Sequence, residues 1–352
     1  GGIYFLSILT IFWASTPAFL FIYNATRNSR ITISAAAIVL FIACFIYGQV
    51  HIAKYKERID RNIMIHVIQP NIPQHLKWDR EAMANNHLQL IELTRRAIAP
   101  YKDKKNLIIW PETATVIQYL LRPDIANQLK PVLSQNPGNK LITGMLRFTQ
   151  NEAGERTLYN SLSVFTPDLT LQSVYDKHHL VPFGEYIPFK NIIPISTVTK
   201  FSGFQSGTGP QILSIDANEA SIIPMICYEA IFPQNSFPTT GDIPLTTFIV
   251  NVTNDGWYGN SNGPHQHMVQ TIFRSVETGY PVIRSANTGI SVIVDPIGRI
   301  LRKASYDTQE ILSYPLLYPT NKRTIFSNNR TLLILALLAV LYGLVRLFIH
   351  KK

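Results

Sequence analysis

The sequence predicts an α/β domain carried by membrane-spanning helices, and two observations lead to this fold class. Three apolar segments of about 20 residues match the length that crosses the ~30 Å core of a bilayer, and their only charge is Arg346; they are residues 3–23, 31–50 and 331–349. Between residues 51 and 330, short apolar runs alternate with amphipathic stretches. We therefore expect two transmembrane helices in residues 1–50, one large domain in residues 51–330 and a third transmembrane helix in residues 331–349.

Hydrophobic periodicity defines the elements of the large domain. Short apolar runs predict strands at residues 63–69, 107–110, 140–146, 158–165, 222–227, 246–252, 282–286 and 291–295. Amphipathic segments predict helices at residues 79–98, 124–133 and 264–278. Residues 177–208 and 232–244 have no clear period, and loops of this length are usually functional or disordered. Because residues 183–204 are rich in aromatic and apolar side chains, we expect them to form a lid at a membrane surface.

The basic residues of the chain indicate a membrane and its orientation. The formal net charge is +10, and the lysines and arginines gather near the ends of the predicted spans, where anionic lipid head groups lie. No basic stripe interleaved with aromatic residues marks a nucleic-acid groove, so no nucleic-acid partner is expected. Short basic loops stay in the cytoplasm. Residues 24–30 and the tail after residue 349 are therefore expected to be cytoplasmic, which places residues 51–330 outside.

The N-terminus indicates a larger protein. The chain begins with two glycines rather than methionine, and it lacks the basic start and small-residue cleavage site of a signal peptide. We expect it to be the C-terminal portion of a longer multi-pass protein, with residues 1–50 as the end of a larger membrane domain.

Three reactive side chains lie at strand ends or at turns that follow a short run of strand-like residues. Glu112 comes after residues 106–109, Lys177 after residues 172–175, and Cys227 at the end of residues 221–226. Acyl transfer needs a nucleophile, a base and a donor for the oxyanion, and these residue types fit the three roles. Cys44 lies in a predicted membrane helix, so Cys227 is expected to be a free thiol whose pKa a nearby Lys177 lowers. The residues alone leave open a buried, inert cysteine and a plain ion pair.

Three motifs carry a family resemblance. Trp110-Pro-Glu112, Tyr175-Asp-Lys177-His-His-Leu180 and Ile226-Cys227-Tyr-Glu-Ala-Ile-Phe-Pro233 together resemble the Glu-Lys-Cys signature of the nitrilase superfamily of carbon-nitrogen hydrolases. The phrases Val181-Pro-Phe-Gly-Glu185-Tyr-Ile-Pro188 and Asn254-Asp-Gly-Trp-Tyr-Gly259, with the flanking membrane helices, are similar to its apolipoprotein N-acyltransferase branch. The resemblance implies a nitrilase-like α-β-β-α sandwich in a multi-pass protein of the bacterial inner membrane, with the catalytic domain on the periplasmic side.

The resemblance also implies a ping-pong reaction. Cys227 would take an acyl chain from a phospholipid, typically phosphatidylethanolamine, as a thioester. Glu112 would be the general base and Lys177 the oxyanion donor. The amine of the diacylglyceryl-cysteine of an apolipoprotein would then accept the chain. Neither a cofactor nor a metal is expected.

Further residues are assigned less central roles. The resemblance gives Glu185 and Glu229 supporting roles around Lys177 and Cys227, against the alternative of solvated loop glutamates. Aromatic residues expected to line the substrate pocket, unless they are core packing, are Tyr228, Trp257, Tyr258, Phe201 and Phe204. Arg274 and Glu277 are expected to pair along a helix. Histidines for which we expect no catalytic or metal-binding role are His178, His179, His265 and His267.

Two other functions remain open from the sequence. A membrane-tethered amidase of the nitrilase type would use the same residues, with water in place of the amine. A catalytically inactive scaffold is the third reading, and the presence of all three reactive residue types disfavours it.

Overall fold

The computed structural model describes residues 2–21, 26–79, 81–150, 154, 156–188, 203–216, 220–236, 246–320 and 324–327. The chain divides into two compact units, Gly1–Glu57 with Lys322–Lys352, and Arg58–Asn321. The predicted membrane segment at residues 331–349 lies outside the described residues.

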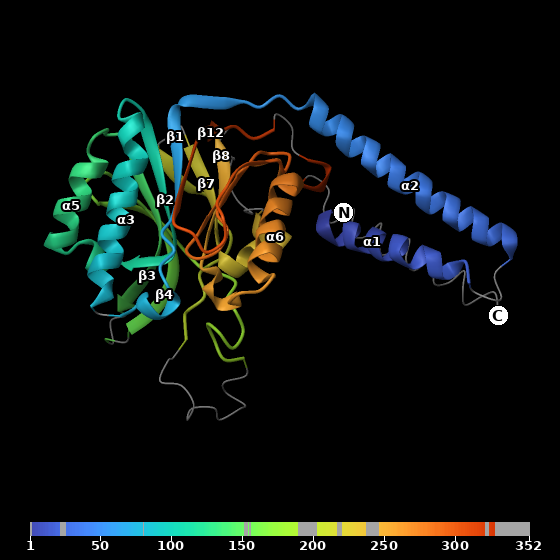
Figure 1. Ribbon diagram of the computed structural model, residues 1–352. Coiled ribbons are helices and arrows are strands. Elements are labelled where there is room, and N and C mark those ends of the chain that lie inside the picture. The colour runs from blue at the N-terminus through green and yellow to red at the C-terminus, as the bar shows by residue number, and fades with distance from the viewer. Residues whose placement is uncertain are drawn as a thin grey trace. The chain divides into compact units, whose positions relative to one another are not determined.

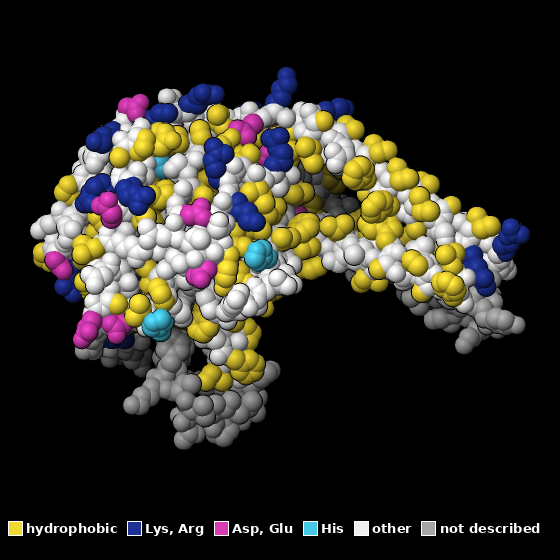
Figure 2. Space-filling view, viewed as in Figure 1, with side chains coloured by type: hydrophobic (Ala, Val, Ile, Leu, Met, Phe, Trp, Pro, Cys, Tyr) yellow, Lys and Arg dark blue, Asp and Glu magenta, His cyan; other side chains and the backbone are white. Residues whose placement is uncertain are grey.

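The first unit contains a pair of apolar helices, α1 (Gly2–Phe19) and α2 (Arg27–Lys54). The two helices pack through Trp13, whose Nε1 donates to the Ala37 carbonyl at 3.1 Å and whose ring meets Phe41 edge-on. Among the described residues, α2 alone is both long and apolar enough to cross a membrane, and α1 is shorter. Hydrophobic side chains cover the exposed surface of α2 in Figure 2. Residues 31–50 therefore form the middle of a longer helix than the sequence predicted.

The second unit is built on two six-stranded sheets. The first sheet has the order β12 (Glu310–Leu317), β1 (Ile59–Gln69), β2 (Lys105–Val116), β3 (Lys140–Gln150), β4 (Arg156–Phe165) and β5 (Leu171–Asp176). The second has the order β11 (Ile300–Lys303), β10 (Val292–Val294), β9 (Val282–Ala286), β8 (Thr247–Thr253), β7 (Ala220–Ile226) and β6 (Leu213–Asp216).

The helices cover the outer faces of these sheets, as Figure 1 shows. Helices α3 (Ala82–Ile98) and α5 (Pro123–Leu133) share a hydrophobic cluster with the first sheet, and α6 (Gly263–Thr278) shares one with the second. A third cluster fills the space between the sheets. The remaining helices are short: α4 (Ile117–Leu120) and the 3-10 helices Gln74–Leu76, Ala99–Tyr101, Cys227–Ile231, Pro233–Ser236 and Asp255–Tyr258. The predicted α-β-β-α sandwich is confirmed.

Burial on both faces explains why the strands read as continuous apolar runs. Along β2, Leu107 and Ile109 face the other sheet, whereas Ile108 and Trp110 face the helices. All eight predicted strands and all three predicted helices are present, with ends that differ by a few residues. The sequence reading did not include β5, β6, β11 and β12 among its strands. Of these, β12 pairs with β1 from the far end of the domain.

The topology brings the ends of several strands together at one edge of each sheet. In the first sheet β1, β2 and β3 are parallel, and β5 runs in the same direction as β3 because β4 is antiparallel to both. In the second sheet β7, β8 and β9 are parallel. The carboxyl ends of parallel strands are where open α/β sheets bind their ligands.

A local irregularity in β2 shapes this edge. The pairing of β2 with β3 is interrupted between Trp110 and Thr115, and Thr113 lies in the left-handed region with φ 47°. At Gly144 of β3, an added Cβ would lie only 2.5 Å from the Glu112 Cα atom. Glycine at this position therefore lets the irregular segment lie against β3.

Gly144→Ala should lower the free energy of unfolding by roughly 1–3 kcal/mol, because overpacking here pushes apart backbone atoms. Thermal unfolding of the purified protein measures the change. Gly138→Ala is the matched control, since a Cβ at Gly138 would meet only side-chain atoms of Lys105. Equal unfolding midpoints for the two variants would contradict this prediction, because they would show that the β2 backbone moves away from the added Cβ without loss of stability.

Candidate active site

Lys177 lies at the centre of a buried cluster of charges. It follows β5 directly and is fully buried. Its Nζ donates to Glu185 Oε1 at 2.8 Å and lies 3.8 Å from Glu112 Oε1. Burial by itself lowers the pKa of Lys177, but Glu112, Cys227 and Glu185 together raise the pKa above its ordinary value. The side chain is therefore a fixed ammonium group at neutral pH.

The sequence predicted that Glu112 follows the strand. The structure instead places it within the irregular part of β2. Its carboxylate accepts hydrogen bonds from Asn160 Nδ2 and from the Asn254 main-chain N–H, both at 2.8 Å. Lys77 donates from Nζ to the Glu112 carbonyl at 2.8 Å, and burial lowers the pKa of Lys77 to about 8. The carboxylate is thus fixed from both sheets while its backbone is held by a second lysine.

Cys227 stands at the turn between β7 and the 3-10 helix Cys227–Ile231. Its φ of 51° is left-handed, which costs a non-glycine residue about 1–2 kcal/mol. Burial and the charge of Glu112 raise the pKa of the thiol to about 12, and the opposing effect of Lys177 is smaller. Lys177 thus lowers the thiol pKa as expected, but burial and Glu112 outweigh this effect. Cys227 is therefore a neutral thiol at neutral pH.

Glu229 joins the nucleophile's turn to the segment that carries Lys177. Its Oε2 accepts the Ile226 N–H at 2.7 Å, next to Cys227. Its Oε1 accepts from the Tyr175 hydroxyl at 2.7 Å and from the N–H groups of His178 and His179 at 2.8 and 3.0 Å. The carboxylate is fully buried, so these donors replace the water that it has lost.

Glu185 secures Lys177 from the loop after β5. Its Oε2 accepts the Val181 N–H at 2.8 Å, and its Oε1 is shared by Lys177 and Asn160. The Phe204 N–H donates to the Glu185 carbonyl at 2.8 Å, so the far end of the predicted lid returns to this point. Residues 189–202 of that lid, with Phe201, lie outside the described residues.

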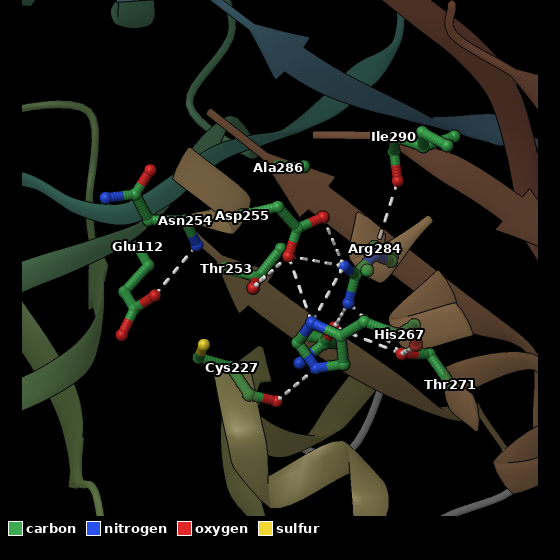
Figure 3. A network of polar contacts seen from close by, with 12 residues as sticks. Glu112, Cys227, Thr253, Asn254, Asp255, His267, Thr271, Arg284, Ala286 and Ile290 are labelled. Atoms are coloured by element: carbon green, nitrogen blue, oxygen red, sulfur yellow. Dashed lines mark hydrogen bonds and ion pairs between the residues drawn. The ribbon is translucent and has the colours of Figure 1, made fainter. Parts of the chain in front are cut away.

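A second polar network lies behind the nucleophile, shown in Figure 3. His267 of α6 contacts the Cys227 carbonyl through Nε2 and Asp255 through Nδ1. Arg284 donates to both carboxylate oxygens of Asp255, at 2.9 and 2.7 Å. The sequence predicted a helix here but no catalytic or metal-binding role for His267, and the structure places this residue on α6, buried and in contact with the Cys227 backbone.

Aromatic side chains gather on the segments that flank Cys227 and Lys177. Phe232 stacks on His179 with ring centroids 3.9 Å apart and meets Tyr228 edge-on at 5.0 Å. Burial raises the pKa of Tyr258 to about 12. The Tyr258 ring meets edge-on the ring of His267, with centroids 5.7 Å apart, and His267 contacts the Cys227 carbonyl. Trp257 beside it is 73% exposed. Tyr228 and Tyr258 thus lie near the nucleophile, and Trp257 faces solvent.

One further expectation concerns an ion pair on α6. Arg274 and Glu277 pair at 2.9 Å along α6, as predicted. Among the residues that the structure describes, no three His, Cys, Asp or Glu side chains come together as a metal site.

Several residues of the site were missed by sequence reasoning. They are Lys77, Asn160, Tyr175, Asp255, His267 and Arg284; Tyr175 and Asp255 lie in the quoted motifs but were given no role. A signal existed for two of them: Asn160 and Arg284 interrupt apolar runs that were predicted as buried strands. Buried polar residues are rare without a partner, so such interruptions point to a network.

The alkylation rate of Cys227 should keep rising between about pH 7 and about pH 10, because a thiol pKa near 12 leaves little thiolate in this range. Iodoacetamide labelling in a Cys44→Ala background isolates Cys227. Glu112→Gln should speed alkylation at about pH 8, since the neutral amide removes a charge that raises the thiol pKa. Glu92→Gln, at an exposed ion pair, is the control. A plateau below about pH 9 would contradict this electrostatic picture.

Known proteins are similar to this chain in sequence and in fold. A family model described as carbon-nitrogen hydrolase matches residues 65–317. The apolipoprotein N-acyltransferase of Rhodopseudomonas palustris is 33% identical over 332 residues, which cover 90% of this chain and 60% of that protein. The Rickettsia prowazekii protein of the same name is 36% identical over 330 residues, covering 93% and 63%.

The chain thus spans about three fifths of the length of these relatives. Among solved structures, Saccharomyces cerevisiae Nit3, a member of branch 10 of the nitrilase superfamily, matches with a TM-score of 0.53 and 17% identity. That match covers 74% of this chain and 91% of the yeast protein, and it shows the shared fold. The chain belongs to the carbon-nitrogen hydrolase family, and within it is similar to apolipoprotein N-acyltransferases over most of its length.

Proposed function

We propose that this protein transfers an acyl chain from a membrane phospholipid to the N-terminal amine of diacylated apolipoproteins. The observation that carries the proposal is the convergence of a neutral thiol, a fixed carboxylate and a buried ammonium group: Cys227, Glu112 and Lys177. The names of the relatives supply the acceptor class. Phosphatidylethanolamine is the expected donor.

In the first half-reaction Glu112 removes the proton from the Cys227 thiol, and the sulfur attacks the ester carbonyl carbon of the phospholipid. The electron pair of the C=O bond moves to oxygen, and Lys177 stabilises this oxyanion together with a main-chain N–H near Cys227. When the intermediate collapses, the ester C–O bond breaks. The leaving alkoxide takes the proton from Glu112, which releases a lysophospholipid and leaves an acyl thioester.

In the second half-reaction the α-amine of the diacylglyceryl-cysteine attacks the thioester carbonyl carbon. Glu112 accepts a proton from the amine, and the C–S bond breaks with the electron pair on sulfur. The proton returns from Glu112 to the thiolate. The product is a triacylated lipoprotein, and every group of the site is restored.

The aromatic residues near the thiol suit a lipid substrate. Phe183 is 77% exposed beside Glu185, Trp257 is 73% exposed, and Tyr258 is partly exposed. Exposed aromatic side chains favour the membrane interface. We assign Tyr228, Trp257, Tyr258, Phe201 and Phe204 to the acyl and head-group path on this ground, with residues 183–204 as a lid.

The apolar segments support a site at a bilayer, which we assign to the bacterial inner membrane. Helices α1 and α2 and residues 331–349 are proposed as spans of a multi-pass protein, with residues 51–330 on the periplasmic side. Access to phospholipid and to exported lipoproteins requires that side. A soluble amide substrate would give no reason for the anchors.

Cys227→Ser should abolish the acyl thioester, because a hydroxyl is a far weaker nucleophile than the thiol in the same site. The measurement is mass spectrometry of the protein after incubation with labelled phosphatidylethanolamine, followed by addition of a diacylated lipopeptide. Cys44→Ala is the control and should keep full activity. Free fatty acid in place of acylated peptide would favour the hydrolase alternative, and an active Cys227→Ser variant would reject the nucleophile.

The topology gives a separate prediction. A reporter fused after Lys352 should be active only in the cytoplasm, because the basic loop at residues 24–30 and the basic tail both remain on that side. Protease added from the periplasmic side should cut within residues 55–320. A periplasmic C-terminus would overturn the arrangement.

A further inference from the structure

The carbonyl group of Cys227 is held by a side chain outside the Glu-Lys-Cys set. His267 Nε2 lies 3.1 Å from this oxygen, and a carbonyl oxygen only accepts hydrogen bonds. Nε2 therefore carries a proton and donates it. His267 is 3% exposed, so water does not compete for this contact.

Buried charges fix the other side of the imidazole ring. Nδ1 of His267 lies 3.0 Å from Asp255 Oδ1, and Arg284 binds that carboxylate through Nη2. Arg284 is in turn held by the Ile290 carbonyl at 3.2 Å and by the Thr271 hydroxyl at 3.1 Å. Figure 3 shows these groups as one continuous network that ends at Cys227. Because the network draws on α6, β9 and the helix after β8, the ring has a defined orientation.

The orientation of this carbonyl bears directly on the reaction. Cys227 has a left-handed φ, a conformation that a non-glycine residue keeps only when its surroundings enforce it. The peptide bond between Cys227 and Tyr228 is planar, and none of the described peptide bonds is cis. Its N–H therefore points away from its C=O. Fixing the carbonyl on His267 directs the Tyr228 N–H to the opposite side of the turn.

We propose that His267 is a positioning residue for acyl transfer, which orients the Cys227–Tyr228 peptide so that the thiol and the Tyr228 N–H face the substrate carbonyl together. This inference rests on the assignment of Cys227 as the nucleophile. It adds a requirement on the backbone of the turn. The hydrogen bond to the Cys227 carbonyl, rather than the contact with Asp255, is the one that matters for the rate.

Two substitutions separate these contacts. In His267→Gln the side-chain amide reaches the position of Nε2 and can still donate to the Cys227 carbonyl. In His267→Asn the shorter amide reaches only the position of Nδ1, so it keeps Asp255 and loses Cys227. His265→Asn is the matched control, since His265 is an exposed residue on the same helix. Thermal unfolding establishes that each variant is folded, and His267→Leu replaces the Asn variant if that variant is not.

The complete protein in detergent is mixed with labelled phosphatidylethanolamine, and the rate of thioester formation is followed against lipid concentration. His267→Asn should lower the maximal rate on the order of tenfold to a hundredfold with an unchanged KM, because misorientation affects the transition state and not lipid binding. His267→Gln should stay within about threefold of the wild type, as should the control.

The outcomes also separate this inference from the proposed function. If the wild-type protein forms no thioester on Cys227, the proposed function fails. If it does, and His267→Asn matches the wild type, only the positioning role is rejected. Loss of rate in a folded His267→Gln variant with full activity in His267→Asn would likewise reject it, and would assign His267 to holding Asp255.

Discussion

The arrangement of the site depends on two buried carboxylates that each accept hydrogen bonds from the opposite sheet. Glu112 belongs to the first sheet and accepts the N–H of Asn254, which follows β8 of the second. Glu229 follows β7 of the second sheet and accepts donors on and after β5 of the first. A buried carboxylate without hydrogen-bond donors is unfavourable by several kcal/mol. A shift of either sheet would break these hydrogen bonds and destabilise the fold by about that amount. The spacing between the thiol and the ammonium is fixed by these cross-sheet bonds.

The charges around the Cys227 thiol determine its protonation state. Two carboxylates, Glu112 and Glu185, share the ammonium of Lys177, so this one cation cannot also hold Cys227 as a thiolate. In the proposed mechanism the thiol therefore remains protonated until a substrate carbonyl is in place. Glu112 would then remove the proton as the sulfur attacks, and Lys177 would stabilise the oxyanion. A resting thiol is also less open to oxidation than a resting thiolate.

The two hydrogen-bond networks around Cys227 hold different backbone groups of the turn. Glu229 fixes the residue before the nucleophile through the Ile226 N–H, whereas His267 fixes the nucleophile's own carbonyl. A left-handed cysteine between a strand and a helix has little intrinsic preference for its conformation. Contacts on both sides of Cys227 stabilise this conformation. They depend on α6, β9 and the loop after β5, which are far apart in the sequence.

The amino-acid sequence was enough to predict the layers, most of the strands and the three reactive residue types. Continuous apolar runs such as residues 222–226 predict buried strands, because a strand covered on both faces can carry no polar side chain without a partner. Short strands at the sheet edges, such as β6 and β11, were missed because their residues are partly exposed and their pattern is weak. Cys227, Glu112 and Lys177 were singled out because each lies in a strand or near its end, and because their motifs occur together.

Only the tertiary structure decided the electrostatics and the supporting contacts. Whether Cys227 is a thiol or a thiolate depends on the balance between burial, Glu112 and Lys177. The spacing of these residues along the chain does not predict this balance. His267 and Arg284 look like ordinary members of a helix and a strand until folding places them beside Asp255 and the Cys227 carbonyl. A motif names the groups that react. The protonation state and orientation of those groups arise from neighbours up to 142 residues away, as for Asn254 and Glu112.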